Sequence, residues 1–445
     1  MNIFIENRKT FRKNGILAVF SVLMAVIFVL LFSYSTSPLY RMYANSDSAI
    51  FQTIGAFWAK GRLPYVELWD HKGPLIFAID AIGYRIGERH GILIIQIISM
   101  SITNIFLFKL AKIKFSTPKA MLVVLLFLVK LILNYEEGNY TEEYMLPFIA
   151  ASIYGMYMWG SGTERSHSAR WAFVYGAGVG ACLLTRITNA VPILGGTCFI
   201  LYELVKYRKL RNIVRNAIFF ALGLMIMVMP FVVYFWIQGA LSEMWYGMIG
   251  YNLTYVQHVG LNLSSKPLLE IVRIFVAYFC SMGLCIISLI LILCGIKKNR
   301  RNKQDYLWLV IAGCMCFLFL SGNGYLHYGI IEGPLVIISA LRIDTLKNCI
   351  YESSAYLERV AKMAIIGGVF FCTISGFWGI KRVMGVCQKH DAREYHIAIL
   401  DNIPQAERDS FIAWHCPNWI YLKEDIVPCY KYFTQTSHTS WCAEP

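Results

Sequence analysis

The feature that most constrains this chain is the series of long apolar segments that fills most of its length. About eleven of them have a length suited to an α-helix crossing the roughly 30 Å hydrocarbon core of a bilayer. Only 15% of the residues are charged, against about 25% in soluble domains. We therefore predict an all-α polytopic membrane protein. The expected spans are about 16–34, 91–111, 120–134, 144–160, 171–187, 189–205, 216–237, 268–294, 306–321, 325–341 and 363–380.

The basic residues are distributed as a membrane topology requires. The net charge is +14, but most Lys and Arg residues lie in short clusters between apolar segments, which argues against a nucleic-acid-binding protein. Cytoplasmic loops are enriched in such residues. With the N-terminus inside, the expected cytoplasmic segments hold more than half of the 41 Lys and Arg residues, whereas segment 135–143, on the other side, holds four Glu and no base.

This alternation holds only if residues 74–87 do not cross the membrane, so we expect an interfacial helix there. An odd number of spans then places the C-terminal tail outside. The expected organisation is a transmembrane catalytic domain over 1–384, with its first outer loop at 35–90, followed by a small extracytoplasmic tail over 385–445. The tail is too small to fold well alone, so we expect it to pack on the outer loops.

The first outer loop mixes acids with aromatic residues, which the joining of two helices does not need. Its sharpest signal is the sequence DHKGP at 70–74, in which Lys72 offers a point charge suited to a phosphate. Asp70 could hold the Lys72 amine or bind a metal. Alternatively, Lys72 is only a membrane-surface lysine beside a helix that starts at Pro74. We predict that the active site lies in this loop.

Asp47, just after the first span, could act as a general base on an acceptor hydroxyl, because a partly desolvated Asp can have a raised pKa. Asp is also a favoured N-cap for the helical stretch that follows, and both interpretations can hold together. Glu142 and Glu143 begin a helix on the same side of the membrane. Acids in a first helical turn suit the helix dipole, so these two are as well explained by structure as by function.

Arg186 lies between two spans near the outer face. A charge at membrane depth is costly and is a functional hypothesis by default, and an arginine there could bind a phosphate with two hydrogen bonds. His327 heads another span on the same side. A lone histidine in such a place is more often an interfacial hydrogen-bonding residue than a catalyst.

The order of these motifs resembles a known family. After the first span the chain reads SDSAIF, then GRLPYVELWDHKGPL, TEEYMLPF, LTRITN, LHYGIIEGP and, in the tail, YKYF. This order resembles the GT-C superfamily of polyprenyl-phosphate-sugar-dependent glycosyltransferases. The similarity is greatest to bacterial members related to protein O-mannosyltransferases and to the lipid A aminoarabinose transferase. It covers nearly the whole chain, and its strongest motif is DHKGPL with the upstream aspartate.

The resemblance implies that Asp47 is the catalytic or acceptor-orienting acid and that Lys72 contacts the lipid phosphate. It places Arg186 near the donor phosphate and His327 at the start of a late helix at the site. It also implies supporting or metal-binding positions at Asp70, Glu142, Glu143 and His327.

The chain departs from the family pattern at three places. Relatives often have Lys-Pro-Pro where this chain has Lys72-Gly73-Pro74, and Glu67 stands where an aspartate is common. The tandem acid of eukaryotic relatives is absent at Asp47-Ser48, so a divalent metal such as Mg or Mn stays an open possibility.

The leading hypothesis is an inverting membrane glycosyltransferase that moves a sugar from a polyprenyl-phosphate donor to an extracytoplasmic cell-wall polymer, glycolipid or protein. Asp47 would take the acceptor proton, while Lys72 and Arg186 stabilise the leaving phosphate. The features lean toward a bacterial cell membrane, with the site on the extracytoplasmic side. The alternative is a flippase or other transporter of lipid-linked glycans, which would carry an inverted repeat and charges near the middle of the membrane.

Overall fold

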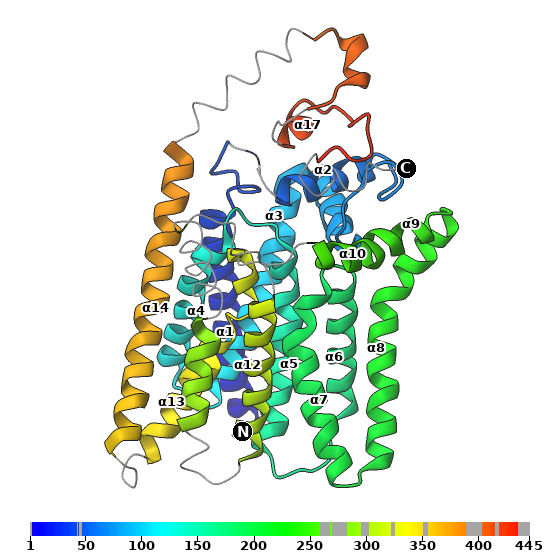
Figure 1. Ribbon diagram of the computed structural model, residues 1–445. Helices are drawn as coiled ribbons and strands as arrows, with labels where there is room; N and C mark the ends of the chain where they lie inside the picture. Colours follow the sequence, from blue (N-terminus) through cyan, green and yellow to red (C-terminus); the bar gives the residue numbers. More distant parts are fainter. Residues whose placement is uncertain are drawn as a thin grey trace.

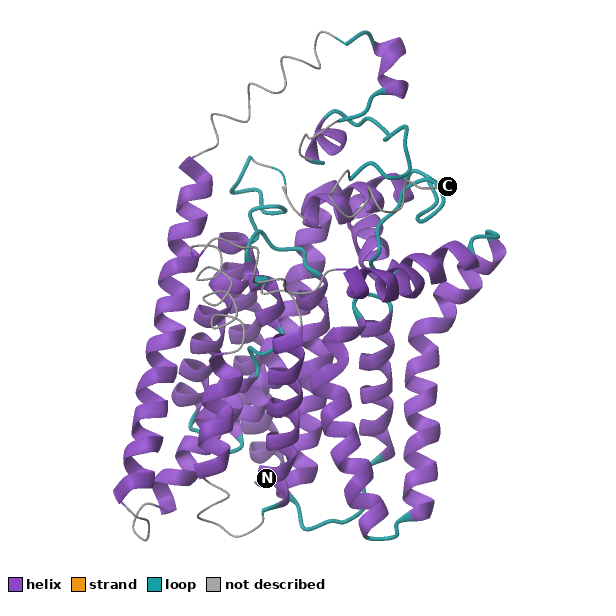
Figure 2. Cartoon of the chain, in the orientation of Figure 1, coloured by secondary structure: helices purple, strands orange, loops and turns teal. Residues whose placement is uncertain are grey.

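The computed structural model describes residues 2–41, 43, 47–258, 268, 283–294, 302–321, 325–349, 355–388, 403–413 and 418–434. In this part of the chain the regular elements are all helical, and no named strand occurs (Figure 2). The all-α polytopic prediction is therefore confirmed.

The long helices lie side by side, and most of them run along one common direction, while the first loop and the C-terminal residues lie together at one end of the bundle (Figure 1). The helical elements are α1 (Asn2–Phe32), α2 (Asp47–Ala59), α3 (Pro74–Lys112), α4 (Thr117–Tyr135), α5 (Thr141–Ser161), α6 (Ala169–Leu183), η1 (Ile187–Ala190), α7 (Val191–Lys206), α8 (Leu210–Ile237), α9 (Leu241–Trp245), η2 (Tyr246–Gly250), α10 (Tyr251–His258), α12 (Lys303–Ser321), η4 (Leu326–Ile330), α13 (Leu335–Cys349), α14 (Ala355–Gln388), η6 (Gln405–Ser410) and α17 (Trp419–Lys423).

Five helices in the described residues are long and apolar enough to cross a membrane, and two shorter apolar helices cover Leu17–Phe32 and Gly283–Cys294. Most of the expected span 268–294 lies outside the described residues, so the count of eleven stays a prediction. The five long candidates are Pro74–Lys112, Thr117–Tyr135, Ile187–Lys206, Leu210–Ile237 and Lys362–Gly385.

One expected span differs from the structure. The segment 325–341 is not a single helix, because η4 and a turn precede α13. Pro334 lacks the N–H that an α-helix needs in its interior, and it lies at the junction where α13 begins. The segment is apolar because most of it is buried inside the bundle, and not because it forms one continuous helix.

α3 contains the predicted boundary between interfacial helix and span. Gly87 and Glu88 have non-helical backbone angles, so the chain bends between 74–86 and the rest of α3. The bend is tight, because a Cβ atom on Gly91 would lie 1.9 Å from the carbonyl oxygen of Gly83. The expected interfacial helix and the expected span are thus joined by this bend, and the backbones of Gly83 and Gly91 on its two sides lie in contact.

The C-terminal residues pack on the first outer loop, as expected. The ring of Trp419 stacks on that of Tyr43 with 6.3 Å between centroids. The N–H of Trp69 donates to the carbonyl of Lys431 at 3.0 Å, and the Trp69 ring meets that of Tyr432 edge to face. The tail therefore covers the loop that holds the candidate site, although the domain boundary at 385 stays a prediction.

Candidate active site

Two loops that are distant in sequence meet at Gly73. The N–H of Gly73 donates a hydrogen bond to the carbonyl of Thr185, 2.9 Å away. A Cβ atom on Gly73 would lie 2.2 Å from the carbonyl carbon and oxygen of Leu184, so a larger residue would force the loops apart. This backbone contact holds Lys72, the residue before the glycine, beside the loop that carries Arg186.

Asp47 is the first residue of α2, and Ser46, its predicted neighbour in the cap, lies outside the described residues. The Nζ atom of Lys72 lies 3.8 Å from Oδ2 of Asp47 and 5.9 Å from the centre of the Phe51 ring. Residues four apart share one face of a helix, so α2 presents a carboxylate and an aromatic face to the same ammonium group.

Basic side chains from three segments act on the carboxylate of Asp47. Burial raises the pKa of its carboxyl group, but Lys72 first of all, and other basic side chains of the site including Arg186, outweigh burial and lower the pKa below its ordinary value. Asp47 is therefore ionised at neutral pH, and its side chain is 40% exposed. Asp47, Lys72, Arg186 and His327 form what we call the Asp47 cluster, and the sequence analysis had named all four.

Arg186 is held by two partners. Its Nη1 donates to Oε1 of Glu142 at 2.9 Å, and its guanidinium carbon lies 3.5 Å from the centre of the Tyr328 ring. The hydroxyl of Thr141 donates to the other oxygen of Glu142 at 2.9 Å. Glu142 thus acts as the counter-ion of Arg186. Tyr328, which the sequence analysis missed, provides the flat surface on which the guanidinium lies.

His327 belongs to a second acid–base group at the edge of the cluster. Its Nδ1 donates to Oε2 of Glu136 at 2.8 Å, and Nη1 of Arg382 donates to the other oxygen of Glu136 at 2.6 Å. The imidazole stacks on the ring of Tyr140, with 4.4 Å between centroids. Burial raises the pKa of Glu136, but His327 and Arg382 lower it overall. The sequence analysis noted the acidic segment 135–143 but did not single out Glu136.

Side chains of α4 hold η4, the element that carries His327 and Tyr328, in place. The side-chain amide of Asn134 donates to the carbonyl of Leu326 at 2.6 Å. Lys130, one helical turn away, donates to the carbonyl of Gly329 and forms an ion pair with Glu332 at 2.9 Å. These contacts explain why an apolar helix carries a lysine.

Asp70 acts on the loop backbone. Its Oδ1 accepts a hydrogen bond from the backbone N–H of Lys72 at 2.9 Å, and the hydroxyl of Tyr65 donates to the carbonyl of Lys72 at 2.7 Å. The ammonium group of Lys72 contacts His71 and Asp47 instead. Burial raises the pKa of Asp70, and the nearby charge of Lys72 opposes this only in part.

Comparison with known proteins finds one protein family whose model matches part of this chain. The model of the dolichyl-phosphate-mannose-protein mannosyltransferase family matches residues 71–236. The resemblance to the GT-C superfamily is confirmed. The match supports a membrane glycosyltransferase of the GT-C type. The matched segment includes Lys72, Glu142 and Arg186, whereas Asp47 and His327 lie outside it. No curated protein matches the chain.

Glu143 does not contact the residues of the Asp47 cluster but enters a separate network. Its carboxylate accepts hydrogen bonds from the hydroxyl of Tyr135, from the amide of Gln96 at 3.0 Å and from the backbone N–H of Asn139 at 3.0 Å. The amide of Asn139 in turn donates to Asp80 at 2.9 Å. All these side chains are buried, so Glu143 joins a polar network that fixes the loop in front of α5.

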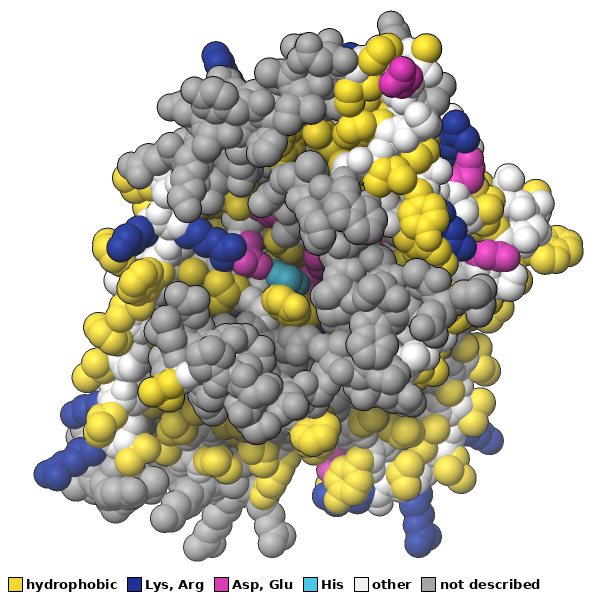
Figure 3. Space-filling model, turned by 45° about the horizontal axis from the view of Figure 1, so that its top comes forward, with side chains coloured by type: hydrophobic (Ala, Val, Ile, Leu, Met, Phe, Trp, Pro, Cys, Tyr) yellow, Lys and Arg dark blue, Asp and Glu magenta, His cyan; other side chains and the backbone are white. Residues whose placement is uncertain are grey.

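The end of the bundle that carries the Asp47 cluster is hollowed, and acidic, basic and histidine side chains gather in the hollow (Figure 3). Among the described residues, no three His, Cys, Asp or Glu side chains come together as a potential metal site. In the structure Asp70 accepts from a backbone N–H and Glu142 from a guanidinium, and a metal-binding role for either residue stays a prediction.

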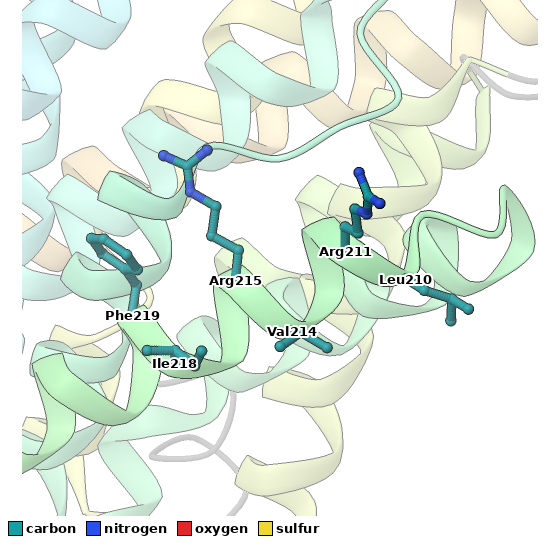
Figure 4. A pocket seen from close by; sticks show the side chains of 6 residues that line it. All are labelled: Leu210, Arg211, Val214, Arg215, Ile218 and Phe219. Carbon is teal, nitrogen blue, oxygen red and sulfur yellow. The ribbon is translucent and has the colours of Figure 1, made fainter.

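A pocket of about 430 Å³ lies elsewhere, on the first turns of α8, near the end of the bundle opposite α2 (Figures 1 and 4). Its lining contains basic and apolar side chains and no acid, so it offers no group that could accept a proton. It belongs to the segment that the positive-inside rule places in the cytoplasm. The lining residues are Leu210, Arg211, Val214, Arg215, Ile218 and Phe219.

Proposed function

We propose that this protein transfers a sugar from a polyprenyl phosphate to an extracytoplasmic acceptor, with inversion at the anomeric carbon. The observation that carries the proposal is the Asp47 cluster, in which an ionised carboxylate lies beside Lys72 and near Arg186. A polyprenyl-phosphate sugar needs cations at headgroup level for its phosphate and a base for the acceptor hydroxyl. The family match supports a transferase of this general class.

The chemistry is a single displacement. The acceptor oxygen attacks the anomeric carbon from the face opposite the phosphate, the bond between that carbon and the phosphate oxygen breaks, and polyprenyl phosphate leaves. Asp47 takes the proton of the acceptor hydroxyl. Lys72 and Arg186 stabilise the negative charge that grows on the leaving phosphate, since cations in a partly water-excluded site act strongly on developing charge.

The ion pair between Asp47 and Lys72 suggests the sequence of events in this reaction, with donor binding before proton transfer. While Lys72 neutralises Asp47, the carboxylate is a weak base. A donor phosphate bound to Lys72 would shield that positive charge, and the pKa of Asp47 would rise toward the value that burial favours. The base then becomes effective after the donor has bound.

The side of the membrane is inferred from charge. The short basic loops after α3, α5 and α7 lie at the end of the bundle opposite α2, near the N-terminus of the chain (Figure 1). Because basic loops remain in the cytoplasm, the Asp47 cluster is expected on the extracytoplasmic side.

A transporter of lipid-linked glycans remains the second candidate, because Lys130 and Glu332 are fully buried charges of the kind that mark transport pathways in membranes. Their contacts favour the transferase. Lys130 also bonds to the carbonyl of Gly329, so the pair holds η4 in place and both charges are already neutralised.

The test uses membranes that contain the wild type, Asp47→Asn or Lys72→Ala, supplied with labelled polyprenyl-phosphate hexoses. The exposed ion pair of Lys60 and Asp425 offers matched controls, since Lys60→Ala and Asp425→Asn remove the same residue types. We expect the wild type and the controls to transfer label and both site variants to lose transfer while keeping their thermal stability. Movement of a lipid-linked sugar between leaflets without donor consumption would instead support the transporter.

A further inference from the structure

The side chains of three consecutive residues, Asp70, His71 and Lys72, form a chain of contacts that ends at the ammonium group. Nζ of Lys72 lies 2.9 Å from Nε2 of His71, and Nδ1 of His71 lies 3.8 Å from Oδ2 of Asp70. The ammonium lies 3.8 Å from Asp47, beyond the length of a hydrogen bond. Of these two neighbours, His71 and Asp47, only His71 is close enough to form a hydrogen bond with the ammonium group of Lys72.

This hydrogen bond determines the state of the imidazole. An ammonium group has three N–H donors and no acceptor, so Nε2 of His71 must supply a lone pair. In the neutral ring the proton then lies on Nδ1, on the side of Asp70, whose carboxylate favours that tautomer. His71 is thus a hydrogen-bond acceptor for Lys72.

The position of His71 is itself fixed by α10. The amide of Asn252 donates to the backbone carbonyl of His71 at 2.8 Å, and the imidazole lies 5.6 Å from the ring of Tyr251, measured between centroids. The side chains of His71 and Lys72 are 22% and 14% exposed. A flexible lysine side chain is thereby held by a residue that α10 keeps in place.

We propose that His71 is a positioning residue for the donor phosphate, which it serves by orienting the ammonium of Lys72. One N–H of Lys72 is used by His71, and the other two remain for Asp47 and for the phosphate. This inference rests on the proposed function. It adds to that function the residue that prepares Lys72, because the ordering of a long side chain before binding removes an entropic cost of recognition.

The test measures binding of farnesyl phosphoglucose, together with its mannose and galactose analogues, and in parallel the kcat and KM of transfer. His71→Phe keeps a ring beside Tyr251 but removes the acceptor, whereas His71→Gln keeps an acceptor at a similar reach. His90→Phe is the matched control, since His90 contacts the backbone carbonyl of Thr36 instead of a cation.

We expect His71→Phe to weaken donor binding and raise the donor KM roughly tenfold, as the loss of a hydrogen bond to a charged group does, with kcat nearly unchanged. His71→Gln should restore most of the affinity, and His90→Phe should bind as the wild type does. His71→Phe should add nothing to the defect of Lys72→Ala when the two are combined.

Equal binding by His71→Phe and the wild type would overturn the inference, as would equal losses in His71→Phe and His71→Gln. So would a fall in kcat together with a lower melting temperature in His71→Phe, because that pattern indicates a structural role. If the wild type neither binds nor consumes any of the three donors, the proposed function itself fails, and this outcome is separate from the others.

Discussion

Replacement of Lys130 by methionine tests whether a buried ion pair holds η4 beneath the Asp47 cluster. Both Lys130 and Glu332 are 0% exposed, and their charged atoms are 2.9 Å apart. Removal of the lysine takes away the charged partner of Glu332 and leaves its carboxylate with the thiol of Cys285 and the backbone N–H of the same residue, 3.2 Å away. A buried charge that loses its partner costs about 3–5 kcal/mol, so Lys130→Met should lower the free energy of unfolding by that amount.

The second variant separates the ion pair from the residue itself. In Lys130→Met/Glu332→Gln no charge is left, and the glutamine can still accept from Cys285. We expect this double variant to recover to within about 1–2 kcal/mol of the wild type, because neutral replacement of a buried pair is often nearly neutral in energy. Glu332→Gln alone completes a double-mutant cycle, and the double variant should lose clearly less stability than the two single losses add up to.

The assay is unfolding in detergent, followed by tryptophan fluorescence, with the donor KM measured on the same samples. Lys60→Met and Asp425→Asn form the control cycle, and because that pair is largely exposed, its interaction energy should stay below about 1 kcal/mol. The reasoning would be refuted if Lys130→Met lowered the free energy of unfolding by less than about 1 kcal/mol. It would also be refuted if the loss in the double variant equalled the sum of the losses in the two single variants.

Three further predictions concern the cluster and its supports. Gly73→Ala should reduce transfer at least tenfold with little loss of expression, because a Cβ there drives apart the loops of Lys72 and Arg186; activity and expression are measured together. Arg186→Lys should raise the donor KM roughly tenfold in the transfer assay, since lysine cannot keep both the pair with Glu142 and the contact with Tyr328. The pKa of Glu136 is lowered in the folded protein, so its stabilising effect is complete above its ordinary pKa of 4.5 and is lost as the pH falls through the lower folded value. Melting temperatures from pH 3 to 7 should therefore fall less toward acid in Glu136→Gln than in the wild type.

Much of the fold and part of the site could be predicted because charge is costly in a membrane. Lys72 and Arg186 are separated by four helices, yet their placement next to apolar spans predicted that both lie near the same face of the membrane. The structure brings them together at Gly73. Polarity thus predicted the end of the bundle at which each residue lies, but it did not predict the contact between their loops.

The rest depended on contacts that composition does not encode. Glu142 and Glu143 are equally acidic and adjacent, but neighbours on a helix point about 100° apart, so one meets Arg186 and the other enters a buried network. The segment 325–341 is apolar enough to be taken for a span, and only the donors Lys130 and Asn134 on α4 reveal that its carbonyls are used outside a helix.

The joint between Gly73 and Thr185 has a consequence for how such an enzyme can diversify. Main-chain atoms make this contact, so it needs glycine at position 73 but does not depend on the identity of the side chains elsewhere in the two loops. The distance between the loops that carry Lys72 and Arg186, the two cations proposed to bind the phosphate, is thus independent of the residues that would contact the sugar or the acceptor. New specificities can arise by substitution in the outer loops and the tail, while the separation of Lys72 and Arg186, and with it the capacity to hold a lipid phosphate, is inherited unaltered.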